Sequence, residues 1–227
     1  LSSHIRLLNG SSFSSFLEKT YIGKITLAAA FPKNAMLIAG SSTKVTDEIK
    51  TFIKGLYQFA HIWLESPMAK MMVPPDGHQL IKELLDLVVF MTENQGDQDA
   101  LGCYIKENKL YAVYATESNA PTAVKEKIAT FINNIKEIAG KNVPPQFLKQ
   151  FEGKTLGIVN GQKAKALFSI PVGMLNNMMK RERELSKILT PASVKKYFGE
   201  YIHIGLFDFP GMIFFGIGGD NLINELN

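Results

Sequence analysis

The stretch Leu101-Gly102-Cys103-Tyr104-Ile105 is followed by the polar turn Lys106-Glu107-Asn108-Lys109 and by a second apolar segment, Leu110–Thr116. Successive side chains of a strand point to opposite faces, and the second segment shows that period of two: Tyr111, Val113 and Ala115 alternate with Ala112, Tyr114 and Thr116. Strands that are joined by a tight turn pair antiparallel. The stretch therefore predicts a β-hairpin.

The same pattern of apolar segment, polar turn and apolar segment recurs along the chain, with copies that begin at Leu27, Leu101, Leu156 and Ile204. Three copies carry glycine as their second residue, and the first copy carries Ala28 there. The copies align without a gap across both apolar segments, whereas their starts lie 74, 55 and 48 residues apart. Hairpins of fixed length separated by helical inserts of varying length predict four ββα units.

We therefore predict an α+β fold in which four repeated β-hairpin–helix (ββα) units form a largely antiparallel sheet, with helices packed mainly on one face. Eight strands are expected, in one sheet or in two sheets of four. The predicted units span residues 25–98, 99–153, 154–200 and 201–227, within a single domain over 25–227. Residues 1–24 are predicted to form a partly mobile N-terminal segment. We also expect a truncation at one or both ends, because the chain begins with Leu1 and stops at Asn227 inside a predicted helix.

The composition is that of an ordinary globular protein, with 46% hydrophobic and 20% charged residues among 227. Cys103 is the only cysteine, so an internal disulfide is impossible. No apolar run approaches the roughly 18 residues that a transmembrane helix needs. The cytoplasm and an extracytoplasmic location after loss of a signal segment are both allowed by the sequence.

The net charge of +4 is concentrated in one stretch. A basic segment over 180–196 is predicted as a possible contact with an anionic partner, through Lys180, Arg181, Arg183, Lys187, Lys195 and Lys196. A solvated helix face is the plainer interpretation, since Glu182 and Glu184 interrupt the run. Nucleic acid is disfavoured as a partner, because no aromatic residue lies among the basic residues of this segment before Tyr197.

Motifs that carry chemistry are missing from the sequence. There is no H-E-x-x-H zinc motif and no G-x-S-x-G nucleophile elbow. Gly216-Ile217-Gly218-Gly219-Asp220 resembles a phosphate loop only in its order of strand, glycines and helix, because no G-K-[ST] follows. We predict no catalytic residue, no cofactor and no metal site. The glycines repeated in the hairpins are interpreted as relieving crowding rather than admitting a ligand.

The leading functional hypothesis is a non-catalytic binding or assembly protein that acts on a protein partner through a sheet face or edge. One alternative is an enzyme whose site is built from the loops after the second strand of each hairpin. Those loops, expected at one end of the sheet, are 40–46, 117–120, 170–172 and 218–221. Another alternative is attachment to an anionic surface through the basic 180–196 helix.

Overall fold

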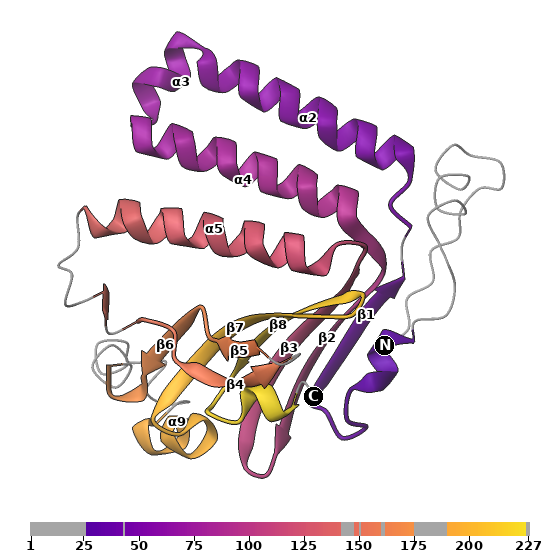
Figure 1. Cartoon of the computed structure of the whole chain (residues 1–227), viewed down its shortest axis with the longest axis vertical. Coiled ribbons are helices and arrows are strands. Elements are labelled where there is room, and N and C mark those ends of the chain that lie inside the picture. The colour runs from indigo at the N-terminus through magenta and orange to yellow at the C-terminus, as the bar shows by residue number, and fades with distance from the viewer. Residues whose placement is uncertain are drawn as a thin grey trace.

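The computed structural model describes residues 26–42, 44–141, 148–149, 151–159, 162–174 and 190–225. Its elements, in chain order, are η1 (Leu27–Ala30), β1 (Leu37–Ser42), α2 (Asp47–Glu65), α3 (Pro67–Met72), α4 (Pro75–Asn94), β2 (Gln95–Lys106), β3 (Lys109–Ser118), α5 (Pro121–Gly140), β4 (Thr155–Val159), β5 (Gln162–Lys165), β6 (Phe168–Pro171), α9 (Pro191–Phe198), β7 (Tyr201–Phe209), β8 (Met212–Gly218) and η2 (Leu222–Glu225) (Figure 1). The predicted N-terminal segment, 1–24, lies outside the described residues.

The main sheet has six strands in the order β1-β2-β3-β8-β7-β6, and every neighbouring pair is antiparallel. β4 and β5 form a separate two-stranded sheet. The α+β class and the antiparallel sheet are therefore confirmed. The division into one eight-stranded sheet or two sheets of four was wrong, because β4 and β5 pair only with each other in the part of the chain that the structure describes.

Two of the four predicted hairpins lie in the main sheet, and a pseudo-two-fold axis relates them. β2–β3 turns at Glu107-Asn108, where both residues have positive φ, and β7–β8 turns at Pro210-Gly211. Ile204 follows Leu101 by 103 positions, and Gly216 follows Val113 by the same interval. Val113 pairs with Gly216 at the junction of β3 and β8, so this pair marks the axis. The outer strands obey it too, since Ala39 pairs with Leu101 and Phe168 pairs with Ile204.

The four equivalent ββα units are not confirmed. The first copy begins with the 3₁₀ helix η1 where a strand was expected, and the run Ala28-Ala29-Ala30 explains this, because alanine favours helix and is depleted in strands. The third copy does form a hairpin, since Val159 pairs with Gln162 across the predicted Asn160-Gly161 turn. Its return strand then breaks, and β6 leaves to join the main sheet. The strands of the main sheet therefore repeat a larger unit twice, in which an outer strand is followed, after an insert, by a hairpin.

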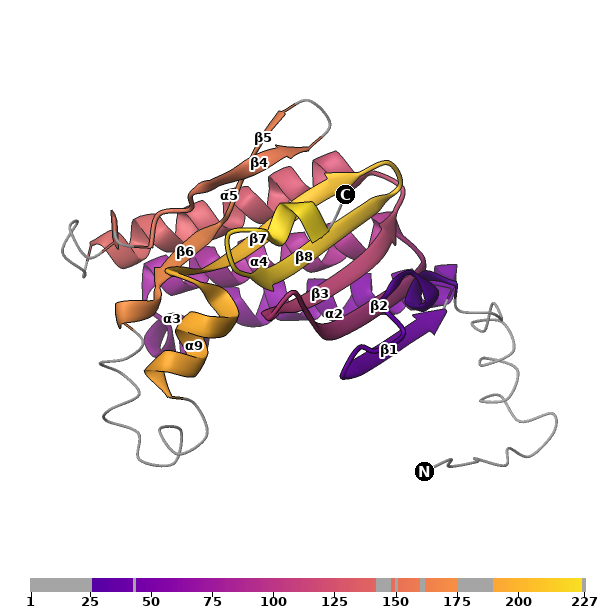
Figure 2. The ribbon, with the colours of Figure 1, turned by 90° about the horizontal axis from the view of Figure 1, so that it is seen from below.

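The long helices cover one face of the main sheet. α5 lies nearest to the sheet, α4 packs on the far side of α5, and α2 lies farthest from the sheet (Figures 1 and 2). The core on this face joins Val124 of α5 to Leu206 and Ile213 of the second hairpin, with Phe90 of α4 packed against them. α2 contacts α3 and α4 and thus forms the outer wall of the molecule.

The opposite face is covered by short elements. Tyr104, Tyr111, Val113 and Phe207 of the sheet pack with Val159 and Ala164 of the β4–β5 hairpin and with Leu222 and Ile223 of η2 (Figure 2). The repeated glycines serve this packing. A Cβ at Gly102 would lie 2.2 Å from the ring of Phe31, and one at Gly205 would lie 2.2 Å from the ring of Phe207. Gly102 and Gly205 therefore make room for phenyl rings, and a Cβ at Gly157 would lie 3.1 Å from Ile223, which supports crowding over ligand access.

Candidate functional site

A serine, a histidine and an aspartate form a hydrogen-bonded chain at the β6–β7 side of the sheet. Ser169 Oγ lies 2.9 Å from His203 Nδ1, and His203 Nε2 lies 2.8 Å from Asp220 Oδ1. Ser169 Oγ also accepts the backbone N–H of Lys154 at 2.8 Å. One tautomer satisfies all three contacts: the serine O–H donates to Nδ1, and the Nε2–H donates to the aspartate.

Ser169, His203 and Asp220 are the residue types of a hydrolase triad, but their arrangement does not suit catalysis. Ser169 and His203 are both 0% exposed, so Oγ cannot reach a substrate. The histidine nitrogens are also exchanged relative to a serine-protease triad, in which Nε2 faces the nucleophile. Only Asp220 reaches solvent, with its side chain 64% exposed. Ser169 and His203 therefore form the buried part of a structural hydrogen-bonded cluster, here called the Ser169–His203–Asp220 relay, whose outer end is the exposed Asp220.

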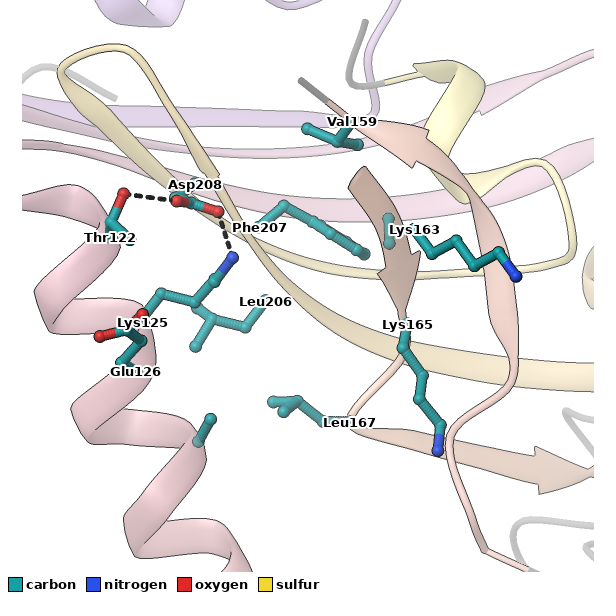
Figure 3. Close-up of a pocket in the computed structure, with 12 residues that line it drawn as sticks. Thr122, Lys125, Glu126, Val159, Lys163, Lys165, Leu167, Leu206, Phe207 and Asp208 are labelled. Atoms are coloured by element: carbon teal, nitrogen blue, oxygen red, sulfur yellow. Dashed lines mark hydrogen bonds and ion pairs between the residues drawn. The ribbon is translucent and has the colours of Figure 1, made fainter. Parts of the chain in front are cut away.

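A cavity of about 480 Å³ lies between α5, β7 and the β4–β5 hairpin (Figure 3). Its apolar lining includes Val159, Leu167, Leu206 and Phe207. Asp208 lies at one end, where it accepts hydrogen bonds from Thr122 Oγ1 at 2.7 Å and from Lys125 Nζ. The ammonium groups of Lys163 and Lys165 point away from this carboxylate (Figure 3). The lining of the cavity is therefore mixed, with apolar side chains beside the Asp208–Lys125 ion pair and further charged residues.

Electrostatics limits what this cavity can catalyse. Burial raises the pKa of Asp208, but the hydrogen bonds from Lys125 and Thr122 outweigh it, and the pKa of Asp208 lies below its usual value. A carboxylate that stays ionised and paired cannot act as a general acid near neutral pH. In the described part of the chain, no three His, Cys, Asp or Glu side chains gather closely enough to hold a metal ion. Asp208 therefore does not supply a general acid in this cavity.

The loops of the alternative enzyme hypothesis do not meet. β3 and β8 are antiparallel neighbours, so the loops that follow them lie at opposite ends of the sheet. The loop after β1 lies at the same end of the sheet as the loop after β3. The loop after β6 lies at the other end, with the loop after β8. The expectation that all four loops share one end was wrong, because the pseudo-two-fold axis turns the second hairpin around.

Most residues of the predicted contact with an anionic partner lie outside the described residues. Lys180, Arg181, Arg183 and Lys187 lie outside the described residues. Lys195 and Lys196 belong to α9, where both are exposed. Lys195 Nζ lies 2.6 Å from Glu200, and Lys196 Nζ lies 5.6 Å from the ring centre of Tyr197. Contact between this segment and an anionic partner stays a prediction.

Two exposed apolar surfaces were not singled out by the sequence patterns. One is the edge strand β1 with the preceding Met36. The other covers α2 and α3, where eight large side chains are between 41% and 83% exposed: Phe52, Leu56, Phe59, Ile62, Trp63, Met68, Met71 and Met72. The only hint of the second surface was that α2 carries apolar residues around most of its circumference, which is more than one buried face requires.

No protein-family model matches this chain, and no curated protein or solved structure is found to be similar to it. Among the helices of the described residues, none has the length and apolar character needed to cross a membrane. Evidence about function therefore comes from the two exposed apolar surfaces and from the geometry of the cavity.

Proposed function

We propose that this chain is a non-catalytic binding protein that pairs an extended segment of a partner protein with the outer edge of β1. The observation that carries the proposal is the open edge itself. Among the described residues, β1 has a neighbour on one side only, which is β2. Met36, Leu37 and Ile38 beside this edge are 61%, 51% and 39% exposed.

The opposite edge of the sheet supports this proposal by contrast. β6 is the pseudo-two-fold equivalent of β1, and the chain itself covers its outer side. Ser169 N–H donates to the backbone oxygen of Phe151 at 3.3 Å, and Glu152 forms an antiparallel bridge with Phe168. The same fold position therefore takes an extended segment at one edge and has none, within the described residues, at the other.

The residues of β1 favour pairing. Natural edge strands are protected against strand addition by lysine, proline, bulges or inward charges. The six residues of β1, Leu-Ile-Ala-Gly-Ser-Ser, include no charge and no proline, and β1 pairs with β2 in unbroken register. An added strand gains main-chain hydrogen bonds from the edge, while its alternate side chains select the partner. Leu37 and Ala39 lie on one face of β1 and Ile38 on the other, so the edge suits an apolar extended segment.

The polar clusters give no competing argument for catalysis. The Ser169–His203–Asp220 relay is closed to substrate, and the carboxylate of Asp208 is held by Lys125 and Thr122. These arrangements favour a role in stability for both clusters. The binding hypothesis therefore needs no group beyond the exposed backbone and side chains of β1.

A titration with a defined peptide tests the proposal. The probe is a blocked heptapeptide of alternating valine and threonine with lysine at each end, followed by amide chemical shifts and amide hydrogen exchange of the protein. We expect shifts and slowed exchange to concentrate in Leu37–Ser42. The same peptide with alternate backbone nitrogens methylated should not bind, because methylation removes the donors that pair with the edge.

A pair of variants completes this test. Ile38→Lys places a charge on the edge and should weaken binding at least tenfold. Ile135→Lys is the matched control, since Ile135 of α5 is also 39% exposed and lies away from β1. Binding that survives both N-methylation and Ile38→Lys, or shifts that centre on another element, would contradict the proposal.

A further inference from the structure

One ridge of α2 faces away from everything else in the described structure. The opposite side of the helix contacts α4: Leu64 is fully buried, and Tyr57 Oη donates to Asp86 of α4 at 2.6 Å. Phe59 follows Tyr57 by two residues, about 200° around the helix. Phe59 therefore points away from α4, and in Figure 1 α2 is the outermost helix.

The outward ridge has the spacing of a helix–helix seam. Phe52, Gly55, Phe59 and Ile62 succeed one another at intervals of three, four and three residues, as the a and d positions of a coiled coil do. Phe52, Phe59 and Ile62 are 65%, 70% and 74% exposed. Such a stripe is typical of a helix that packs against another helix.

The exposed area is large enough for a stable interface. The eight large side chains of α2 and α3 each offer roughly 200 Å² when fully exposed. Their exposed fractions then leave on the order of 1,000 Å² of apolar surface, against about 300–600 Å² for the largest patch on a typical monomer. About 800 Å² per partner suffices for a specific protein–protein interface. The surface therefore has the extent of a subunit interface.

Gly55 provides an independent observation. It lies in the middle of α2, where glycine weakens a helix, and a Cβ built on it would meet nothing within 4 Å. Packing within the described chain therefore gives no reason for a glycine at this position. A missing side chain on an outward ridge lets the backbone of a second helix approach closely.

We propose that the α2–α3 surface binds a second copy of this chain, with the two α2 helices crossing at Gly55 about a two-fold axis. Gly55 is adjacent to the centre of the 19-residue helix, so a two-fold axis there overlaps the two helices along their full length. An isologous contact needs one self-complementary patch, and an uncharged ridge with its gap at the centre meets that condition.

The charge of the surface favours a protein over a membrane. α2 and α3 carry three acidic residues (Asp47, Glu48 and Glu65) and three lysines (Lys50, Lys54 and Lys70). Helices that lie on anionic membranes are rich in lysine and arginine on their polar face. The balanced charge here gives no electrostatic attraction to such a surface. This inference is independent of strand pairing at β1, which lies in the sheet.

A disulfide cross-link tests the geometry. In a chain with Cys103→Ala, the variant Gly55→Cys should form a covalent dimer under mild oxidation, because the crossing places the two residues within the roughly 7 Å between Cα atoms that a disulfide spans. Gln58→Cys in the same background is the matched control. Gln58 is exposed on α2 but lies off the ridge, so it should stay monomeric on a non-reducing gel.

The oligomeric state tests the interface. Sedimentation velocity of the full chain should show a dimer at tens of micromolar. Phe59→Glu should raise the dissociation constant at least a hundredfold, whereas Gln58→Glu, which adds the same charge one residue away, should change it less than threefold. Circular dichroism and thermal melting of both variants exclude misfolding as the cause.

Three outcomes would overturn the proposal. The first is a monomeric chain at several hundred micromolar. The second is a dimer that Phe59→Glu leaves intact, because another surface would then hold it. The third is a monomer that binds vesicles of phosphatidylcholine and phosphatidylserine through α2, because the surface would then serve a membrane.

Discussion

Replacement of Ser169 by alanine tests whether the Ser169–His203–Asp220 relay is structural. The serine hydroxyl holds two groups at once, the backbone N–H of Lys154 at 2.8 Å and Nδ1 of His203 at 2.9 Å. Ser169→Ala leaves both without this partner. Because Ser169 and His203 are 0% exposed, the space left by one oxygen atom is too small and too enclosed for a compensating water.

The cost follows from what each orphaned group loses. A buried polar atom left without a partner costs about 1–3 kcal/mol, which applies to His203 Nδ1. The N–H of Lys154 lies nearer the surface and loses an ordinary hydrogen bond, about 0.5–1.5 kcal/mol. We therefore expect Ser169→Ala to lower the free energy of unfolding by about 2–4 kcal/mol. Asp220→Asn should cost less than about 1 kcal/mol, because the amide oxygen of asparagine can still accept the Nε2–H of His203.

Urea denaturation at 25 °C, followed by far-ultraviolet circular dichroism, measures these differences. Ser42→Ala is the matched control. Ser42 is also buried, at 7% exposure, but its Oγ has no hydrogen-bond partner among the described residues. Removal of an unsatisfied buried hydroxyl should leave stability unchanged or raise it.

Two results would refute this account of the relay. If Ser169→Ala destabilised the protein by no more than Ser42→Ala does, the hydrogen bonds of Ser169 would carry no net free energy. Labelling of native Ser169 by a fluorophosphonate probe would show that its hydroxyl is accessible and activated. We expect no labelling before the protein unfolds.

Three further perturbations follow from the packing and the charges. Gly102→Val should cost about 1–3 kcal/mol in urea denaturation because its side chain overlaps the ring of Phe31, and the cost should shrink in a Phe31→Ala background. The pKa of Asp208 is lowered in the folded state. Its contribution to stability is therefore complete above about pH 4 and is lost as the pH falls through the folded pKa. Acid titrations monitored by fluorescence should show a smaller loss of stability below about pH 4 in Asp208→Asn than in the wild type. Glu117 accepts the backbone N–H groups of Asp97 and Gln98 at 3.1 Å each, at the irregular start of β2, so Glu117→Ala should speed amide exchange there and cost about 1–2 kcal/mol.

The hairpins were the part of the fold that the sequence could predict, because their signals are local. Alternation in 110–116 and the short turns at 107–108 and 210–211 act between residues close in the chain. Which hairpin lies beside which depends on contacts such as Val113 with Gly216, and no local pattern encodes that choice. The expectation about the loops failed for this reason.

The exposed surfaces were hidden from sequence reasoning for another physical reason. Periodicity in α2 marks Phe52, Leu56 and Trp63 as apolar, but a helix with apolar residues around most of its surface does not show which side meets its neighbour. Only the placement of α4 decides that Leu64 is buried and Phe59 exposed. The open edge of β1 likewise depends on the position of the strand in the sheet.

The pseudo-two-fold seam between β3 and β8 has a consequence for the order of folding. Each hairpin closes through a two-residue turn, so its pairing needs little loop entropy and can form early. The seam joins residues about a hundred positions apart, and its closure has to await an encounter between two preformed halves. Substitutions along the seam should therefore slow the rate-limiting step, whereas changes in the outer strands should mainly hasten unfolding.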